Sequence, residues 1–216
     1  MAEEHRSGVW TIVVGGGRGD RYGRPKQYEL LGGERIIDRS RRIAEEVSEG
    51  VVVVVPSDDA EREGSVAGGS TRCRSVRAGL AAVPDGADVV CVHDAARPLA
   101  STALYGRVID AVRQGADGAV PGVPVPDTIK VVAGEVVVDT PDRDTLVAVQ
   151  TPQAFRADVL RAAHACCAEG TDDAVLVERA GGRVVVVAGE ATNVKITVPE
   201  DLASATRLME PTAVTT

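Results

Sequence analysis

The sequence predicts an α/β fold: a three-layer sandwich with a mostly parallel central sheet. Apolar runs of strand length recur along the chain and are continuous rather than alternating, as expected for strands buried on both faces. Segments with helical spacing separate these runs, and this alternation is typical of a Rossmann-like sheet with helices on both sides. The predicted strands are Val9–Val14, Val51–Val55, Val89–Val92, Gly118–Val123, Val147–Val149 and Arg183–Val187.

Four helices are predicted between or after these strands. The first has an apolar stripe from Ile36 to Val47, and the second has one from Leu104 to Val112 with Ser101 as its N-cap. A third stripe runs from Val159 to Cys167. The last helix begins at Pro199, where proline and the two acidic residues that follow suit a first turn.

Composition limits the class of protein. The chain has 216 residues, of which 44% are hydrophobic, 26% charged and 2% aromatic, with a net charge of −8. These values describe a globular protein with an aliphatic core, and the acidic balance argues against nucleic acid as a partner. No apolar run is long enough for a membrane span and no signal peptide is recognisable, so a cytoplasmic protein is predicted. Without a linker or repeat, we expect a single domain over residues 1–216.

The four cysteines do not show a metal-binding pattern. None forms a C-x-x-C pair, so buried free thiols are favoured over metal ligands. They are Cys73, Cys91, Cys166 and Cys167.

A glycine-rich loop directly follows the first predicted strand. Five glycines lie within the nine residues 15–23, and arginines and a lysine are interspersed through residue 26. Glycine lets backbone N–H groups approach an anion, and the basic side chains add charge, which predicts a polyphosphate site. The spacing fits neither the dinucleotide fingerprint nor the P-loop. A flexible connector with solvated arginines is the alternative.

One segment departs from the sandwich pattern. Residues Thr128–Val138 predict a hairpin that turns near Ala133-Gly134 and is too short to cover its own apolar residues. It is either a projecting β-arm that pairs with a second subunit or an edge hairpin of the monomer.

Four further clusters lie in predicted loops. In Gly68–Val76 a second glycine turn leads into a helix that Ser75 could cap. His93–Pro98 follows a strand, where Asp94 could bind Mg²⁺ or substrate hydroxyls or form an ion pair with Arg97. Gln150–Gln153 places polar residues at the end of a strand, where they either serve the site or form an ordinary turn. In Thr192–Thr197, Lys195 lies within a predicted strand whose apolar and polar residues alternate. Lys195 either takes part in the site or lies on an ordinary exposed face of that strand.

Together these clusters offer many anion-binding groups, few general bases and no cofactor motif. That balance favours phosphoryl or nucleotidyl transfer. An attacking phosphate oxyanion needs no strong base, and catalysis then consists of aligning two polyanions and stabilising charge at the α-phosphorus.

The ordered series of motifs from about residue 10 to residue 207 resembles the 2-C-methyl-D-erythritol 4-phosphate cytidylyltransferase family of the non-mevalonate isoprenoid pathway. The most specific blocks are His93–Pro98 and Thr151–Gln153 in combination. The others are Gly17–Gly23, Pro25–Gln27, Gly69…Arg72…Ser75-Val76, Asp127–Lys130, Thr171-Asp172, Asn193–Lys195 and Pro199–Leu202.

The resemblance implies that CTP and 2-C-methyl-D-erythritol 4-phosphate react, with Mg²⁺ or another divalent cation, to give the CDP-alcohol and pyrophosphate. The metal ligands are not implied. Arg21 and Lys26 would hold the triphosphate, and Lys195 would hold the attacking phosphate. Residues implied to bind the nucleotide are Gly15, Gly16, Gly17, Gly19, Gly69, Ser70 and Ser75. Residues implied to bind the polyol phosphate are Asp94, Arg97, Thr128, Thr151 and Thr171.

The family also has a β-arm that completes the site of a partner subunit, which implies a homodimer. Here the arm would span roughly residues 125–145, and Thr128 and Arg143 would reach the partner's substrate phosphate. This chain departs from the family in having Gly15-Gly16 before Gly17, a shorter interval between Gly23 and Pro25, and Ser70 at a position that is acidic in some members.

Three alternative functions remain open at this point. They are a ribitol-5-phosphate cytidylyltransferase, a sugar-1-phosphate nucleotidyltransferase that uses another nucleotide, and a catalytically silent CTP-binding paralogue.

Overall fold

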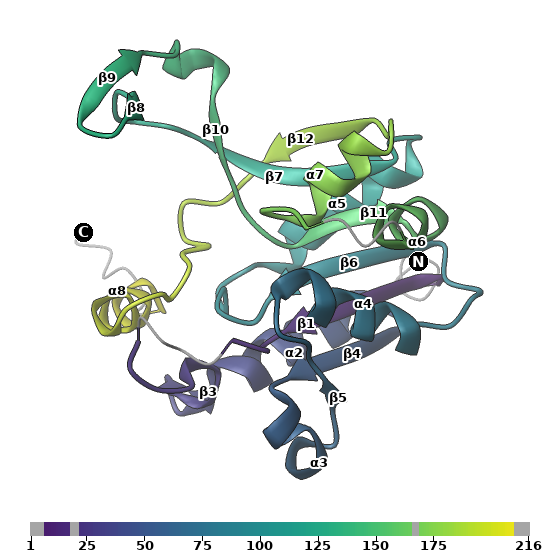
Figure 1. Cartoon of the computed structure of the whole chain (residues 1–216). Helices are drawn as coiled ribbons and strands as arrows, with labels where there is room; N and C mark the ends of the chain where they lie inside the picture. Colours follow the sequence, from purple (N-terminus) through teal and green to yellow (C-terminus); the bar gives the residue numbers. More distant parts are fainter. Residues whose placement is uncertain (1–6, 18–21, 166–168, 210–216) are drawn as a thin grey trace, which may run out of the picture.

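The computed structural model describes residues 7–17, 22–165 and 169–209. Its centre is an eight-stranded sheet in the order β10-β7-β11-β6-β1-β4-β5, with β12 paired to β7 (Figure 1). The strands are β1 (Val9–Val14), β4 (Gly50–Val55), β5 (Val66–Ala67), β6 (Val89–Asp94), β7 (Gly118–Pro124), β10 (Val147–Val149), β11 (Gln153–Arg156) and β12 (Val184–Ala188). All six predicted strands are present, with ends that differ from the prediction by at most two residues.

The sheet is mostly parallel. β1 pairs in parallel with both β4 and β6, and β12 pairs in parallel with β7. The exceptions are β10 and β11, which run antiparallel to their neighbours. The sequence did not indicate β11, because it has four residues and only the central Ala154 and Phe155 carry a strand-like apolar signal.

Helices cover both faces of the sheet. On one face, α2 (Ile36–Val47) and α5 (Thr102–Arg113) pack on the side chains of Val9, Val13 and their neighbours. On the other, α4 (Arg72–Ala82), α6 (Ala157–Ala165) and α7 (Asp173–Arg179) pack on Ile12, Val90 and their neighbours. The predicted three-layer sandwich is therefore confirmed. The alternating direction of side chains along each strand sends successive valines into the two cores.

The helix caps confirm one prediction and correct another. Ser101 is the N-cap of α5 and accepts a hydrogen bond from the Leu104 N–H at 3.0 Å. The prediction that Ser75 caps α4 was wrong. Thr71 is the N-cap, accepting from the Arg74 N–H at 3.2 Å, and Ser75 lies inside the helix. Thr71 follows the glycine turn directly, so the helix begins one turn earlier than predicted.

The segment around Lys195 is not a strand, contrary to the prediction. Residues 193–197 have no regular secondary structure, and the Ile196 N–H donates to the Ala96 carbonyl at 2.8 Å. Val194 and Ile196 alternate with Lys195 as in a strand, but both apolar side chains belong to a small cluster with Leu31 and Ala205. α8 (Pro199–Met209) follows, and Asp201 accepts from the Thr197 and Val198 N–H groups at its start.

The predicted hairpin is present and stands away from the sheet (Figure 1). It consists of β8 (Val131–Ala133) and β9 (Val136–Asp139), which pair with each other and not with the main sheet. The turn places Gly134 at φ +61°, a conformation that favours glycine. Every residue of both strands is exposed, including Val132, Val136, Val137 and Val138.

Short elements complete the described part of the chain. They are β2 (Leu30–Leu31), β3 (Glu34–Arg35), α3 (Ala60–Glu63) and the 3₁₀ turns η1 (Lys26–Tyr28), η2 (Ser57–Asp59) and η3 (Arg143–Thr145). Among the described residues, no helix is long and apolar enough to cross a membrane. Cys73 and Cys91 are buried and free of disulfides, as predicted, while Cys166 and Cys167 lie outside the described residues.

Candidate active site

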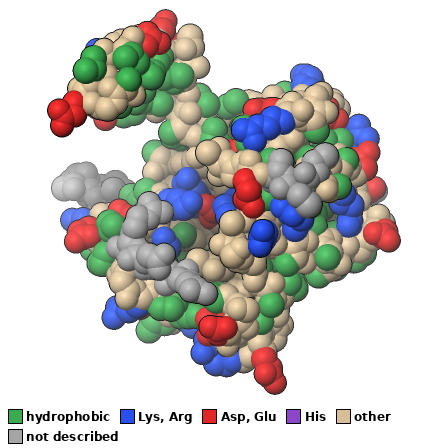
Figure 2. Space-filling view, viewed as in Figure 1, with side chains coloured by type: hydrophobic (Ala, Val, Ile, Leu, Met, Phe, Trp, Pro, Cys, Tyr) green, Lys and Arg blue, Asp and Glu red, His purple; other side chains and the backbone are tan. Residues whose placement is uncertain are grey.

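Most of the predicted site residues in the described part of the chain gather where strands β1, β4 and β6 end. In open α/β sheets this carboxyl edge is where ligands bind. The Gly15–Gly17 loop follows β1, and the turn from Asp94 to Arg97 follows β6. Figure 2 shows charged side chains of both signs around the hollow between the body and the arm. The structure thus brings a glycine loop and a charged turn to one edge.

The glycine loop is held tightly at its start and opens afterwards. The Gly15 N–H donates to the Val54 carbonyl at 2.7 Å, and a Cβ on Gly15 would lie 2.9 Å from Ile37 Cδ1. A Cβ on Gly17 would meet no described residue within 4 Å. Packing is therefore close around Gly15, and the described residues leave space at Gly17. Gly19 and Arg21 lie outside the described residues, and Lys26 follows half-buried at the start of η1.

Ser75 links this loop to the second glycine turn. Its hydroxyl accepts from the Gly69 N–H at 3.2 Å and donates to the Thr71 carbonyl at 3.0 Å. A Cβ on Gly16 would lie 3.0 Å from the same oxygen. Ser70 is exposed beside it and accepts from the Arg74 guanidinium at 3.3 Å. The two glycine segments therefore lie next to each other, although they are over fifty residues apart in sequence.

Asp94 carries the charge at the centre of the site. One carboxylate oxygen accepts from Arg72 Nε at 3.1 Å, and the other accepts from Lys195 Nζ at 2.6 Å. Burial works against the charged carboxylate, but Arg72 and Lys195 outweigh it and hold the pKa of Asp94 well below its usual range. Asp94 is therefore ionised at neutral pH. The Asp94–Arg97 ion pair that the sequence left open is not the arrangement found.

Arg97 instead ties three segments together through backbone carbonyls. Its guanidinium donates to Asn193 O at 2.8 Å and to Val149 O at 3.5 Å. Asn193 in turn donates from its side chain to Thr151 O at 2.9 Å. Burial lowers the pKa of Arg97, while the nearby Asp94 acts in the opposite direction. Arg97 thus fixes the Lys195 segment and β10 against the turn after β6.

The Thr151 hydroxyl and His93 lie directly beneath Asp94. His93 Nε2 is 3.2 Å from the Arg97 carbonyl, which can only accept, so Nε2 carries the proton. The bare Nδ1 then accepts from the Thr151 hydroxyl at 3.3 Å, and the same hydroxyl accepts from the Asp94 N–H at 3.0 Å. Burial lowers the pKa of His93 to about 4. His93 is therefore neutral and orients the turn rather than acting as a base.

Three predicted site residues lie apart from this cluster. Thr128 and Arg143 lie at the two sides of the arm's base, where Arg143 donates to the Pro126 carbonyl at 2.9 Å. Thr171 is exposed just before α7. In the described part of the chain no hydrogen bond or ion pair joins any of the three to Asp94.

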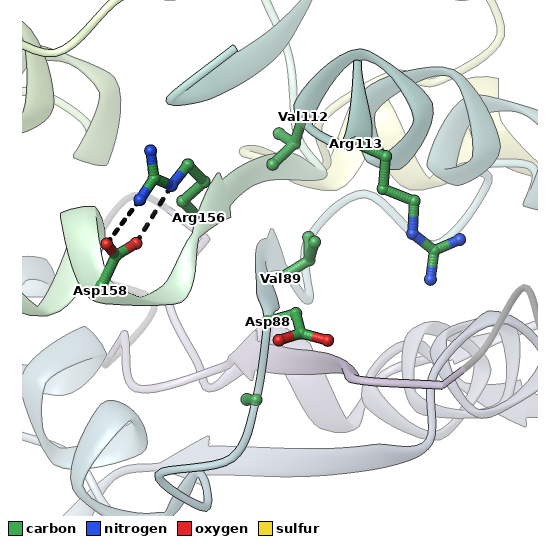
Figure 3. Close-up of a pocket in the computed structure, with 7 residues that line it drawn as sticks. Asp88, Val89, Val112, Arg113, Arg156 and Asp158 are labelled. Atoms are coloured by element: carbon green, nitrogen blue, oxygen red, sulfur yellow. Dashed lines mark hydrogen bonds and ion pairs between the residues drawn. The ribbon is translucent and has the colours of Figure 1, made fainter. Parts of the chain in front are cut away.

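A separate pocket of about 410 Å³ lies at the opposite, amino edge of the sheet (Figure 3). Val89, which begins β6, lines it, whereas Asp94 ends the same strand. Arg156 and Asp158 in its wall pair with each other at 2.7 Å. Since the predicted site residues lie at the other edge of the sheet, this pocket is not the candidate site.

Three polar residues of the cluster had no role in the sequence-based prediction: Arg72, His93 and Asp173. Asp173 is buried, and its carboxylate accepts from Arg72 at 2.6 Å and from His164 Nε2 at 3.0 Å. Arg72 and His93 belong to motifs singled out in the sequence, and Asp173 directly follows the Thr171-Asp172 block. Their partners are distant in the chain, however, so spacing alone could not assign the contacts.

Fold and site together define the class of protein. The mostly parallel sheet carries a glycine loop after its first strand, and beside this loop lie a carboxylate held between two cations and a neutral histidine. This arrangement is suited to aligning polyanions. It is typical of a nucleotidyltransferase. The model of the 2-C-methyl-D-erythritol 4-phosphate cytidylyltransferase family matches residues 9–211. The chain belongs to this family.

Known relatives agree with this assignment. The 2-C-methyl-D-erythritol 4-phosphate cytidylyltransferase of Rubrobacter xylanophilus is 44% identical, covering 94% of this chain and 95% of that protein. The bifunctional enzyme IspD/IspF of Nitratidesulfovibrio vulgaris is 43% identical over 90% of this chain, which spans 56% of that relative. The crystal structure of the Thermus thermophilus cytidylyltransferase superposes with a TM-score of 0.79 at 35% identity, covering 92% of this chain and 97% of that one.

Proposed function

We propose that the protein transfers the cytidylyl group of CTP to the phosphate of 2-C-methyl-D-erythritol 4-phosphate, giving the CDP-alcohol and pyrophosphate. The observation that carries the proposal is the family match over residues 9–211, together with Asp94 held between Arg72 and Lys195 beside the glycine loops. No observation favours ribitol 5-phosphate, a sugar 1-phosphate or a silent paralogue.

The reaction is an in-line displacement at the α-phosphorus of CTP. An oxygen of the acceptor phosphate forms the new P–O bond, and the bond between the α-phosphorus and its bridging oxygen breaks, so that pyrophosphate leaves with that electron pair. The oxyanion is already deprotonated, so no base is required, in accord with a neutral His93. Arg21, Lys26 and Lys195 would offset the charge that develops on the phosphates.

The two glycine segments would bind the nucleotide. No described residue would lie within 4 Å of a Cβ on Gly17, and the Ser75 hydroxyl binds the second turn and lies close to Gly16 in the first. Backbone N–H groups in such loops suit phosphate and ribose oxygens. The residues proposed to surround CTP are Gly15, Gly16, Gly17, Gly19, Gly69, Ser70 and Ser75.

The polyol phosphate would bind on the Asp94 side. The ionised carboxylate of Asp94 accepts hydrogen bonds from hydroxyl groups, and Lys195 would leave it to hold the acceptor phosphate. Arg97 and Thr151 would shape this part of the site, since their hydrogen bonds already fix the backbone around Asp94. Thr171 would border the same space.

We propose that the arm, roughly residues 125–145, completes the site of a second copy in a homodimer. Its two strands expose apolar side chains that nothing in the described chain covers. Such a patch on a monomer is typical of an interaction surface. Thr128 and Arg143, which lie apart from Asp94 in their own chain, would then contact the partner's acceptor phosphate.

A divalent cation would reach the site on the triphosphate. The described residues contain no group of three or more His, Cys, Asp or Glu side chains that could hold a metal ion, and both oxygens of Asp94 are engaged by cations. These residues do not form a metal cage. Mg²⁺ is commonly bound mainly by substrate phosphates and water, and it would offset triphosphate charge here.

Since both substrates are intracellular metabolites, we place the reaction in the cytoplasm.

Pyrophosphate release tests the proposal. We expect release with CTP and 2-C-methyl-D-erythritol 4-phosphate, and little with ribitol 5-phosphate, a sugar 1-phosphate or other nucleoside triphosphates. Preferred use of ribitol 5-phosphate would overturn the substrate assignment. CTP binding without release from any acceptor would instead identify a silent paralogue.

A further inference from the structure

A continuous chain of charged groups runs from the site into the protein interior. Lys195 Nζ contacts Asp94, whose other oxygen accepts from Arg72 Nε at 3.1 Å. Arg72 NH1 contacts Asp173 at 2.6 Å. The chain ends where His164 Nε2 meets the second oxygen of Asp173 at 3.0 Å. These groups come from α4, α6, α7, the end of β6 and the segment before α8.

The two ends of the chain differ in how firmly they are held. The Asp173 and His164 side chains are 1% and 2% exposed, whereas the Lys195 side chain is 41% exposed. Arg72 bridges the two aspartates with separate nitrogens of one planar guanidinium, so its orientation is fixed by both. Lysine is a flexible point charge and can leave a carboxylate without disturbing a second contact. Arg72 is thus the fixed partner of Asp94, and Lys195 is the exchangeable one.

We propose that Arg72 is a positioning residue for the acceptor side of the site, in which it keeps Asp94 paired and in place when Lys195 leaves to hold the acceptor phosphate. This inference rests on the proposed cytidylyl transfer. Asp173, itself held by His164, anchors the guanidinium from behind. Without Arg72, Lys195 would be the remaining cation on a largely buried carboxylate, and its release would leave that charge unpaired.

The buried end of the chain does not itself form a reactive centre. Cys73 Sγ lies 3.6 Å from His164 Nδ1, so cysteine, histidine and Asp173 are in the order of a nucleophile triad. The Cys73 side chain is buried, with the residue 4% exposed, which denies a substrate access to the sulfur. His164 therefore serves to hold Asp173, and through it Arg72.

A double-mutant cycle tests the proposal. Arg72→Gln, Asp94→Asn and the double variant are compared with wild type by kcat and by KM for CTP and for the acceptor. We expect Arg72→Gln to lower kcat/KM for the acceptor by on the order of 100-fold, with KM for CTP changed by less than about threefold. In the Asp94→Asn background the same substitution should cost less than about threefold, because the two act through one contact. Arg72→Lys, which keeps one cation near Asp94, should recover part of the loss.

Controls separate positioning from stability. Arg156→Gln removes an arginine that also bridges two aspartates, Asp117 and Asp158, but at the opposite edge of the sheet, and it should leave both KM values unchanged. If Arg72→Gln folds poorly, Arg72→Gln/Asp173→Asn replaces the buried ion pair by two amides and should show the same loss at the acceptor. The inference would be overturned if Arg72→Gln lowered kcat/KM for the acceptor equally in wild type and in Asp94→Asn. Equal rises in KM for CTP and in KM for the acceptor would also overturn it. Wild-type protein that releases no pyrophosphate would instead overturn the proposed function.

Discussion

At the scale of single residues, contacts converge on Asp94. Its N–H is bound by the Thr151 hydroxyl, its carbonyl accepts from the Arg97 N–H at 2.9 Å, and its carboxylate is shared by Arg72 and Lys195. Backbone and side chain are therefore both fixed before any ligand arrives. Such preorganisation of a charged group is what an enzyme needs where substrate hydroxyls must be aligned.

Asp94→Asn should impair acceptor use selectively. The amide cannot satisfy two cations, so we expect kcat/KM for the polyol phosphate to fall by on the order of 100-fold, with KM for CTP within about threefold of wild type. Initial rates of pyrophosphate release at varied acceptor and CTP measure both values. Asp158→Asn, at an exposed aspartate on the opposite edge, is the matched control. Equal losses in the two variants would contradict the role of Asp94.

His93 should make the protein less stable in mild acid. Its pKa of about 4 lies below the ordinary 6.5, so the unfolded chain binds the proton first as the pH falls. The contribution of neutral His93 to the free energy of unfolding is complete above pH 6.5 and is lost as the pH falls toward 4. From pH 7 to pH 5 we expect a loss of about 2 kcal/mol in the free energy of unfolding from this group.

Urea unfolding at pH 5 and pH 7 measures this loss in wild type and in His93→Gln. The glutamine amide can both donate and accept but does not titrate, so the variant should show a smaller pH dependence by that amount. Parallel pH dependence in the two proteins would show that His93 is not the group responsible.

At the scale of elements, the arm exposes the apolar side chains of both its strands. Its strands pair with each other, and Val138 is 58% exposed. We expect wild type to sediment as a dimer and Val138→Asp as a monomer, because the charge would be buried in the interface. The monomer should also lose at least about tenfold in turnover if the arm supplies residues to its partner.

The control for the arm is Val186→Asp. Val186 lies on β12, which pairs with β7, and it is exposed to a similar degree, 55%. That variant should remain a dimer with wild-type turnover. A Val138→Asp protein that still sediments as a dimer would contradict the use of the arm in assembly.

The elements also show which sequence signals were sufficient. β1, β4 and β6 were predictable because each is a continuous run of mainly β-branched residues in a two-sided core. β11 was not, because antiparallel insertion between β6 and β7 needs only two buried apolar residues. The Lys195 segment was assigned as a strand because local alternation does not reveal that its backbone partners are loop residues.

The same limit applies to the site. The spacing of Asp94 and Arg97 correctly placed them in one turn and suggested an ion pair. The partner of Asp94 is instead Arg72, from a helix 22 residues earlier, and Arg97 donates to carbonyls 52 and 96 residues later. Such contacts depend on which elements the fold brings together, and that information is not local.

At the scale of the whole molecule, positive charge is concentrated where the ligands would be. The chain has a net charge of −8, yet its candidate site holds Arg72 and Lys195 on one carboxylate, with Arg97 in the same turn as that carboxylate. A local basic site on an acidic protein is suited to small polyanions rather than to nucleic acid. Two phosphorylated substrates are therefore expected to meet at this edge of the sheet.

Phosphorus NMR of the reaction of CTP with 2-C-methyl-D-erythritol 4-phosphate labelled with oxygen-18 in its phosphate tests this account most directly. If the acceptor phosphate attacks the α-phosphorus, all of the label stays in the cytidylylated product and the pyrophosphate is unlabelled. Label in the pyrophosphate, or CMP formed beside unchanged acceptor, would contradict it.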